Sequence, residues 1–306
     1  MLGDILEHSG FISVTGPPNS GKSTFLNKLL GRKISIVTEK AQTTRNRILG
    51  IQTTENSQLV FTDTPGITET SFGKVLNRWM NRFSFSAARD ADIILFFVDT
   101  SVQHPENGML KDEKYILSKL PENSTAILVV NKCDKVKPKR IEDTAVIYSR
   151  AFKFKNVFTI SAKTGDGIPE LMKGILSLIP EGPQYFPKDD ITDQEDNFII
   201  SEIIREKAFS FLHQEIPYSI TVITDSVKHE ENLITLHASI HAARKSQKGM
   251  IIGKKGKMLK KIGSAARLEL EEIFEKKVML NLYVRVEEKW NEKENLMIKM
   301  GFTKDF

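Results

Sequence analysis

The sequence GPPNSGKS at residues 16–23 has the residue types and spacing of a phosphate-binding loop. In this pattern a Gly is followed by four residues, then by Gly-Lys and Ser or Thr, and backbone N–H groups surround a polyphosphate. The apolar run 11–15 predicts a strand before the loop, and residues 24–30 predict a helix that Gly31 ends. Because a helix N-terminus favours negative charge, we expect a polyphosphate here rather than a simple turn.

Three side chains in and beyond this loop are typical of a polyphosphate site that also holds Mg²⁺. We expect Lys22 to reach the β- and γ-phosphates and the Ser23 hydroxyl to ligate the metal. Asp63 ends an expected strand and begins DTPG at 63–66, where a carboxylate supports the metal indirectly. The sequence therefore predicts a metal together with a nucleotide.

The sequence NKCD at residues 131–134 predicts which base the nucleotide carries. The Asp134 carboxylate can accept from both N1–H and the 2-amino group of guanine, whereas adenine would leave this charged acceptor unpaired, at a cost of about 1–3 kcal/mol. We expect Asn131 to tie this segment to the phosphate-binding loop and to contact the base, and SAK at 161–163 to support the base through a backbone N–H. Taken singly, each motif is also explained by a polar loop or turn, but their order favours GTP over ATP.

These motifs must be positioned by a sheet, because each one follows a short apolar run. The runs 47–53 and 58–63 predict a hairpin, and short strands then alternate with helices. Such alternation predicts an α/β domain with a mostly parallel sheet, helices on both faces and ligands at the carboxyl ends of the strands. The further strands are expected over 92–98, 126–131 and 157–160, and the helices over 73–89, 111–120, 139–152 and 168–179.

Length and composition place the chain among cytoplasmic globular proteins. Its 306 residues exceed the usual size of one core, so we expect two domains. The longest apolar run, 93–98, cannot cross a bilayer, and the N-terminus lacks the regions of a signal peptide. The single Cys133 excludes an intrachain disulfide, and no Cys/His cluster has zinc spacing.

Charge is concentrated in one part of the C-terminal half. The segment 183–306 holds about 20 basic and 20 acidic residues, yet 244–261 holds eight Lys or Arg and no Asp or Glu. Within this run, GKKG at 253–256 lies between two expected helices and lets a backbone approach closely. The run predicts a phosphate-binding patch for nucleic acid, although charge alone is equally explained by a solvated lysine-rich helix face.

The five segments GPPNSGKS, TTR, DTPG, NKCD and SAK together resemble the G-motifs of a translation-factor-class GTPase, over residues from about 11 to 179. Beyond 197 the expected order is a helix, two strands, the GKKG loop between helices, and a strand over 277–286. That order resembles an α+β type II KH domain, whose glycine loop clamps single-stranded RNA. The resemblance implies three parts: a G domain over 1–180, a linker over 181–197 and a KH domain with a C-terminal helix over 198–306.

A G domain followed by a KH domain is the arrangement of the bacterial Era GTPases, which this chain resembles along its whole length. The resemblance implies a factor that assembles the small ribosomal subunit and binds single-stranded 16S rRNA near its 3′ end while GTP is bound. It also links the family to the inner face of the membrane, although no amphipathic anchor stands out. We expect a monomer.

The resemblance also implies how hydrolysis proceeds. The switch threonine that ligates Mg²⁺ maps onto Thr43 or Thr44, of which we favour Thr44, and the Gly66 N–H is expected to contact the γ-phosphate. Ras-like enzymes place a Gln where this chain has Ile67, so slow intrinsic turnover is expected. Asn19 resembles the residue with which potassium-activated GTPases hold K⁺, but it could equally only shape the loop.

The expected residues fall into three sets. The catalytic set is Lys22, Thr44 and Gly66, with Ser23, Thr44 and Asp63 at Mg²⁺ and Asn19 at K⁺. GTP is expected to be bound by Gly16, Pro17, Pro18, Asn19, Ser20, Gly21, Lys22, Ser23, Asp63, Thr64, Pro65, Gly66, Asn131, Lys132, Asp134, Ser161, Ala162 and Lys163. RNA is expected to be bound by Arg244, Ile251, Ile252, Gly253, Lys254, Lys255, Gly256, Lys257, Lys260 and Lys261, with Ile262 in the apolar floor of the groove.

Two other functions compete with this interpretation. Ile67 favours a nucleotide-gated RNA-binding protein in which hydrolysis is vestigial, whereas intact Lys22, Ser23 and Asp63 oppose it. A P-loop ATPase or kinase is opposed by Asp134.

Overall fold

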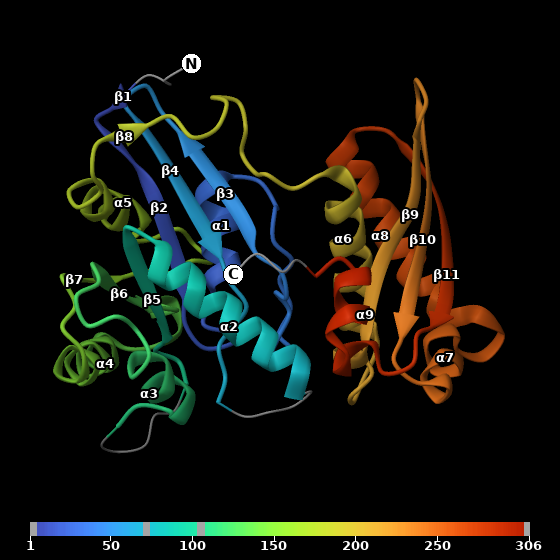
Figure 1. Ribbon diagram of the computed structural model, residues 1–306, viewed down its shortest axis with the longest axis horizontal. Helices are drawn as coiled ribbons and strands as arrows, with labels where there is room; N and C mark the ends of the chain where they lie inside the picture. The colour runs from blue at the N-terminus through green and yellow to red at the C-terminus, as the bar shows by residue number, and fades with distance from the viewer. Residues whose placement is uncertain (1–4, 70–73, 103–107, 303–306) are drawn as a thin grey trace. The chain divides into compact units, whose positions relative to one another are not determined.

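The computed structural model describes residues 5–69, 74–102 and 108–302 (Figure 1). The chain forms two compact units, of which the first holds residues 5–69, 77–102 and 108–193 and the second holds residues 74–76 and 194–302. Each unit contains its own sheet. No helix among the described residues is long and apolar enough to cross a membrane.

The first unit is built on a six-stranded sheet in the order β3-β4-β2-β5-β6-β7. All neighbouring strands are parallel except the β3–β4 hairpin, which is antiparallel, so the predicted α/β class and the predicted hairpin are both confirmed. The strands are β2 (His8–Thr15), β3 (Ile48–Thr53), β4 (Ser57–Asp63), β5 (Ile93–Asp99), β6 (Ala126–Asn131) and β7 (Asn156–Thr159).

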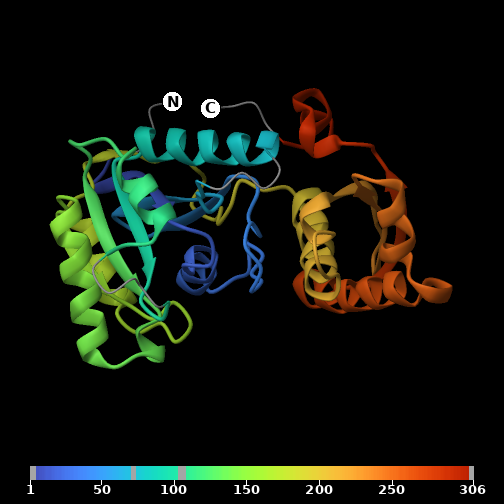
Figure 2. The same cartoon turned by 90° about the horizontal axis from the view of Figure 1, so that it is seen from below.

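Helices cover both faces of this sheet, and α1 and α2 lie on opposite faces (Figures 1 and 2). Every residue of β4, β5 and β6 is buried, as strands covered on both sides require. The helix expected over 73–89 is present, although Gly73 lies outside the described residues. The helices are α1 (Lys22–Leu30), α2 (Lys74–Asp90), α3 (Lys111–Leu117), α4 (Pro138–Ala151) and α5 (Ile168–Leu176), with the short 3-10 helix η1 (Cys133–Lys135) after β6.

Much of the segment expected to be a linker is fixed on the first unit. Its start is held by β8 (Gly182–Pro183), which pairs with β1 (Ile5–Leu6). Gln58 on β4 is fully buried; its Oε1 accepts from Tyr185 N and Phe186 N at 2.7 and 2.9 Å, and its Nε2 donates to Phe186 O at 2.9 Å. Ile51 N on β3 donates to Ile191 O at 2.9 Å. Residues 180–191 are therefore a strap across strands β2, β4 and β3 of the sheet.

The second unit has the element order predicted for a KH domain. Its sheet has the order β11-β10-β9, with β10 parallel to β11 and antiparallel to β9. Helices α6 and α8 pack on each other, α6 against β9 and α8 against β11. The elements are α6 (Asp196–Phe211), η2 (Pro217–Ser219), β9 (Ile220–His229), β10 (Leu233–Ala242), α7 (Lys245–Ile252), η3 (Lys254–Gly256), α8 (Lys257–Phe274), β11 (Lys277–Val286), η4 (Trp290–Glu292) and α9 (Glu294–Lys299).

Candidate functional site

The phosphate-binding loop lies between the end of β2 and the first residue of α1. Gly21, just before the helix, has a φ of 94°, and a side chain there would collide with the amide of Asn131. Gly66, after β4, approaches the backbone of Pro18 so closely that a Cβ on it would lie 2.6 Å from Pro18 Cα. Side chains at these two glycines would push apart three segments that meet around the loop, so the backbone itself must line the site.

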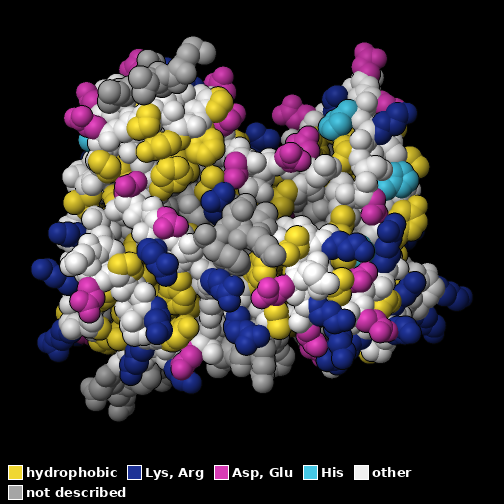
Figure 3. Space-filling model, viewed as in Figure 1, with side chains coloured by type: hydrophobic (Ala, Val, Ile, Leu, Met, Phe, Trp, Pro, Cys, Tyr) yellow, Lys and Arg dark blue, Asp and Glu magenta, His cyan; other side chains and the backbone are white. Residues whose placement is uncertain are grey.

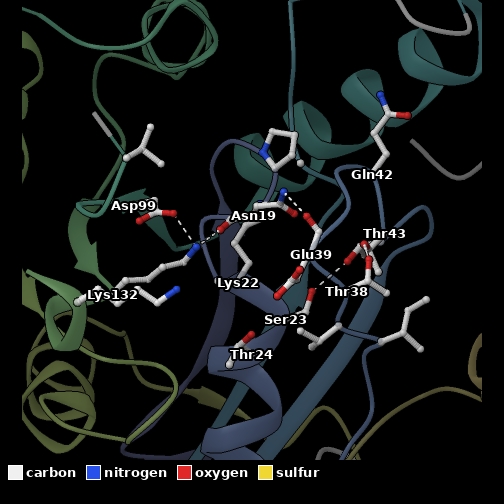
Figure 4. A pocket seen from close by; sticks show the side chains of 18 residues that line it. Asn19, Lys22, Ser23, Thr24, Thr38, Glu39, Gln42, Thr43, Asp99 and Lys132 are labelled. Carbon is white, nitrogen blue, oxygen red and sulfur yellow. Dashed lines mark hydrogen bonds and ion pairs between the residues drawn. The ribbon is translucent and has the colours of Figure 1, made fainter. Parts of the chain in front are cut away.

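A pocket of about 550 Å³ opens over the loop (Figure 4). It brings together residues from the loop, α1, the segment before β3, the end of β4, the end of β5 and the segment after β6. Among the residues that line it are Pro18, Asn19, Gly21, Lys22, Ser23, Thr44, Gly66, Asp99 and Lys132.

Lys22 is the buried cation of this pocket, with 5% of its surface exposed. Its ammonium donates to Pro17 O at 2.7 Å and to Gly16 O at 3.1 Å, which are carbonyls of the loop itself. Burial lowers the pKa of Lys22 to about 8, although the charge of Asp63 opposes this effect. A bound polyphosphate would place negative charge beside this buried ammonium and so stabilise its charged form.

Ser23, Thr44 and Asp63 meet beside Lys22. Ser23 Oγ donates to Asp63 Oδ2 at 2.6 Å and lies 3.0 Å from Thr44 Oγ1. Burial raises the pKa of Asp63, and the Ser23 hydrogen bond and the Lys22 charge oppose this shift. Asp63 Oδ1 is buried without a hydrogen-bond partner. Hard oxygen donors around an uncompensated carboxylate fit Mg²⁺. Thr43, the alternative to Thr44, instead binds Thr38 Oγ1 at 2.6 Å.

Protein ligands alone do not complete a metal site here. Among the residues that the structure describes, no three His, Cys, Asp or Glu side chains gather where they could hold an ion. A divalent ion beside Asp63 would therefore take its remaining ligands from hydroxyls, water and the nucleotide, as Mg²⁺ commonly does.

The segment after β6 is held in place from two sides. Asn131 Nδ2 donates to Ser20 O at 2.7 Å, which is the expected tie to the phosphate-binding loop, and Asn131 Oδ1 accepts from Ala162 N at 2.9 Å. Ser161 Oγ donates to Asp134 Oδ1 at 2.7 Å. Asp134 is exposed and its other carboxylate oxygen is left for a base. Of the backbone N–H groups of SAK, which were expected to support the base, that of Ala162 donates to Asn131.

Several residues that were expected to bind GTP instead form hydrogen bonds within the protein that hold the loop and its neighbouring segment in place. Ser20 Oγ donates to Pro17 O at 3.0 Å, and Thr64 Oγ1 donates to Val14 O at 3.0 Å. Pro65 O accepts from Ser84 Oγ at 2.9 Å. Lys163, in contrast, is exposed. These bonds fix the backbone whose N–H groups face the pocket.

A series of hydrogen bonds that the sequence motifs did not predict runs along the pocket (Figure 4). The Lys132 ammonium donates to Asp99 Oδ2 at 2.6 Å and to Asn19 O at 2.7 Å, and Asn19 Nδ2 donates to Glu39 O at 3.0 Å. Asp99 and Glu39 were missed because each stands alone in the sequence. The available signal was that Asp99 ends a buried strand next to the phosphate-binding strand.

Ile67, which stands where Ras-like enzymes have Gln, is fully buried in the core. It packs with residues of β5, β6 and α4, including Phe96, Leu128 and Tyr148. This side chain is buried and carries no hydrogen-bonding atom, so it does not orient a water molecule in this structure.

The glycine loop of the second unit presents lysines to solvent. Gly253 and Gly256 have φ of 71° and 74°, and Lys255 between them has a φ of 52°, so the chain turns sharply from α7 into α8. Lys254, Lys255 and Lys257 are exposed. Figure 3 shows Lys and Arg side chains gathered over the part of this unit where α7 lies.

A groove of about 430 Å³ runs from this loop between α8 and β11. Lys260 lies in it, as expected, whereas Lys261 places its ammonium 4.2 Å from the ring centroid of Phe211 on α6. Arg244 is exposed at the start of α7, at the opposite end of that helix from the loop. The groove is lined by Gly256, Leu259, Lys260, Gly263, Ser264, Arg267, Leu280 and Leu282.

The expected apolar floor differs from the observed one. Ile251 and Ile262 have no exposed surface and lie in the core, while Ile252 is partly exposed. Ile251 and Ile262 do not line this groove, because their side chains anchor the two helices beneath the loop. Leu259, Leu280 and Leu282 supply the apolar surface instead.

Comparison with known families matches each unit separately. Residues 11–132 match the family described as 50S ribosome-binding GTPase, and residues 215–291 match the KH domain family. The two matches fall in the first and second units and cover the pocket and the glycine loop respectively.

Curated relatives match almost the whole chain. GTPase Era from Geotalea daltonii is 43% identical over 297 residues, which cover 96% of this chain and 98% of the relative. GTPase Era from Syntrophus aciditrophicus is 43% identical over 302 residues, covering 97% and 96%.

Two solved structures are similar across both units. Aquifex aeolicus Era, as a variant bound to GDP·AlF4⁻, is 36% identical with a TM-score of 0.89, covering 96% of this chain and 99% of that one. Era in complex with MgGDPNP and nucleotides 1506–1542 of 16S ribosomal RNA is 36% identical with a TM-score of 0.88, covering 96% and 98%. Since relatives of this identity match the chain from end to end, it belongs to the Era family of GTPases.

Proposed function

We propose that this chain is a GTP-switched assembly factor of the small ribosomal subunit that holds the single-stranded 3′ region of 16S rRNA. The observation that carries the proposal is the pairing of a preformed nucleotide pocket with a lysine-bearing glycine loop in one chain. The related Era structure with MgGDPNP and 16S rRNA nucleotides has the same two units and supports the assignment of both ligands. Such a factor works in the cytoplasm, where subunits are assembled.

In the first unit, the proposed occupant is GTP or GDP. Loop amides from Gly16 to Ser23 and the Lys22 ammonium surround the phosphates, and Asp134 selects guanine. Lys22 and the backbone N–H of Gly66 lie where charge develops on the transferred phosphoryl group, and catalysis is positioning plus electrostatic stabilisation. Hydrolysis removes the γ-phosphate that Gly66 contacts and beside which Thr44 ligates Mg²⁺, which releases both switch segments.

Mg²⁺ is the proposed divalent cofactor, held by Ser23 and Thr44 and supported by Asp63, and it neutralises phosphate charge when bound. For K⁺, the support is the approach of Asn19 to the Glu39 carbonyl at 3.0 Å. If the Asn19 amide turns over, two oxygens face each other beside the phosphates. We expect faster hydrolysis in KCl than in NaCl at the same ionic strength; equal rates would remove K⁺ from the proposal.

In the second unit, RNA is proposed to lie along the glycine loop and the groove beside it. Glycines allow the sugar-phosphate chain to approach the backbone, and Lys254, Lys255 and Lys257 supply positive charge at the same turn. The groove lined by Leu259 and Leu280 offers an apolar surface for unstacked bases. This arrangement suits a single strand.

The test of this site reverses the charge at two lysines of the glycine loop. The double variant Lys254→Asp/Lys255→Asp should lower affinity for a 16S 3′-end oligonucleotide by about 100-fold, while GDP affinity stays unchanged. Fluorescence anisotropy would measure the RNA and a labelled GDP would measure the nucleotide.

The matched control is Lys276→Asp/Lys277→Asp, which makes the same charge change at another adjacent, exposed pair of the same unit. This control should weaken RNA binding only slightly. If the loop variant bound RNA as the control does, the proposed RNA site would be refuted.

A further inference from the structure

Asp99 is a carboxylate in the nucleotide pocket that belongs to none of the five G-motifs. It ends β5, the strand between the phosphate-binding strand β2 and strand β6, and it pairs in register with Asn131. Only 8% of its surface is exposed, and it lines the pocket. A buried charge at this place must be compensated by specific partners.

Two donors fix the orientation of this carboxylate. Asp99 Oδ1 accepts from Ser101 N at 2.9 Å and from Ser101 Oγ at 2.6 Å. The turn that carries Ser101 is itself held from α4, because Arg140 Nη2 donates to Val102 O at 2.6 Å. As a result Oδ2 is presented toward one place in the pocket.

Lys132 occupies that place. Its ammonium lies 2.6 Å from Asp99 Oδ2 and 2.7 Å from Asn19 O, so it bridges β5 and the phosphate-binding loop (Figure 4). The side chains are 24% exposed for Lys132 and 11% for Asp99, which is less solvent than a surface pair sees. Lys132 also has a φ of 64°, so its backbone is already in a restricted conformation.

We propose that Asp99 is a positioning residue for guanine nucleotides that acts through Lys132. It keeps the Lys132 side chain extended along the pocket between Asp134 and the phosphate-binding loop. The segment that contacts the base and the loop that surrounds the phosphates are then both ordered before the nucleotide binds. Without the Asp99 charge, the Lys132 ammonium keeps one neutral acceptor, the Asn19 carbonyl, and its side chain gains rotational freedom. Nucleotide binding must then order this side chain again. The inference rests on the proposed placement of the nucleotide in this pocket.

Because Asp99 lies on the side of the base segment and not beside Ser23 or Gly66, it acts on nucleotide binding rather than on the chemical step. An interaction made equally in the ground state and the transition state changes KM and leaves kcat unaltered. GDP and GTP should be affected alike.

The test is Asp99→Asn in the full chain, with Asp92→Asn as the matched control. Asp92 precedes the same strand at its opposite end, where its carboxylate accepts from Phe11 N at 2.8 Å. We expect Asp99→Asn to raise the dissociation rate of labelled GDP and the KM for GTP by about tenfold with kcat unchanged. The control should change neither.

A double-mutant cycle with Lys132→Met separates positioning from a general structural role. If Asp99 acts through Lys132, then Asp99→Asn should have almost no further effect on GDP affinity in the Lys132→Met background. Equal effects of Asp99→Asn in both backgrounds, or a lower melting temperature with unchanged GDP affinity, would overturn the inference. If Lys132→Met itself left GDP affinity unchanged, the placement of the nucleotide would fail as well.

Discussion

The nucleotide pocket and the glycine loop are both proposed to bind phosphates, yet they are built in opposite ways. Four polar side chains in and around the pocket are buried, with Ser20 and Asp63 0% exposed, Asn131 1% and Lys22 5%. At the loop, Lys254 and Lys255 are exposed on a turn made by two glycines. The difference teaches how each ligand is held: a short polyphosphate can be enclosed, whereas an RNA chain must enter and leave across a surface.

This difference sets how each site responds to change. In the pocket each polar side chain also holds a neighbour, as Asn131 holds both Ser20 and Ala162, so a single substitution disturbs several segments. At the loop each lysine adds its charge with little dependence on the others. We therefore expect large effects of single substitutions in the pocket and graded effects at the loop.

The largest effect is expected from Lys22→Ala. It removes the one ammonium that is buried among the loop carbonyls, and GTP turnover should fall by about 10²–10³-fold, the usual cost of losing one preorganised donor. Phosphate release under single-turnover conditions would measure it. Lys28→Ala, at an exposed lysine of the same helix, should leave turnover unchanged; equal losses in both variants would break the distinction between enclosed and exposed charge.

The next effect concerns Asp134→Asn. The new side chain keeps an oxygen for the Ser161 hydroxyl, so the segment should remain folded, but it places an amide donor against the donors of guanine. GTP affinity should fall by about 100-fold while affinity for xanthosine triphosphate, which has a carbonyl at that position, rises. Competition titrations would measure both, and an unchanged preference for GTP would show that Asp134 does not read the base.

The salt dependence of binding should differ between the two sites, and this effect should be smaller than those of the two substitutions. If about four lysines neutralise phosphates of a single strand, a fourfold rise in salt should weaken RNA binding by about 50-fold. GDP affinity should change far less, because the pocket is shielded from solvent ions. Equal salt dependence of the two affinities would contradict the comparison.

The smallest effect is a response of the second unit to acid. Burial, followed by the charge of Arg285, lowers the pKa of His241, while Asp225 and Glu287 oppose the shift and Lys299 adds to it. Both ring nitrogens are buried without a partner. Below the ordinary histidine pKa of about 6.5 the unfolded chain takes up a proton that the folded unit resists, so stability is lost as pH falls.

The expected loss in unfolding free energy is at most about 1.4 kcal/mol per pH unit as the pH falls through this range. Urea unfolding at a series of pH values would measure it. His241→Gln should flatten the dependence, whereas His213→Gln, at an exposed histidine of the same unit, should not. A dependence that His241→Gln leaves intact would assign the acid response to another group.

Much of both units could be predicted from the sequence because the motifs stand at the ends of apolar strands. The run AILVVN gave the strand observed as β6, and the strand observed as β11 was expected over the same residues, 277–286. A short, fully buried apolar run such as β6 has few alternatives to a strand. The convergence of Ser23, Thr44 and Asp63 also follows from strand order, because the carboxyl ends of β2 and β4 are neighbours.

The remaining features depended on the face of its strand or helix on which a side chain lies, and a local sequence pattern does not determine that face. Gln58 is a polar residue that is buried because the strap supplies backbone partners from a segment more than a hundred residues away. Ile251 reads as a groove residue but points into the core. Asp99 has no motif, and only the register of β5 beside β6 brings it to Lys132.

We propose that the nucleotide in the first unit governs how tightly the second unit holds RNA. The most direct test is the affinity of the purified chain for a single 16S 3′-end fragment, titrated with the pocket empty, with GDP and with a non-hydrolysable GTP analogue. We expect binding about 5–150-fold tighter with the analogue than with GDP, the usual range of coupling between two sites. The same affinity in all three states would refute the proposed coupling.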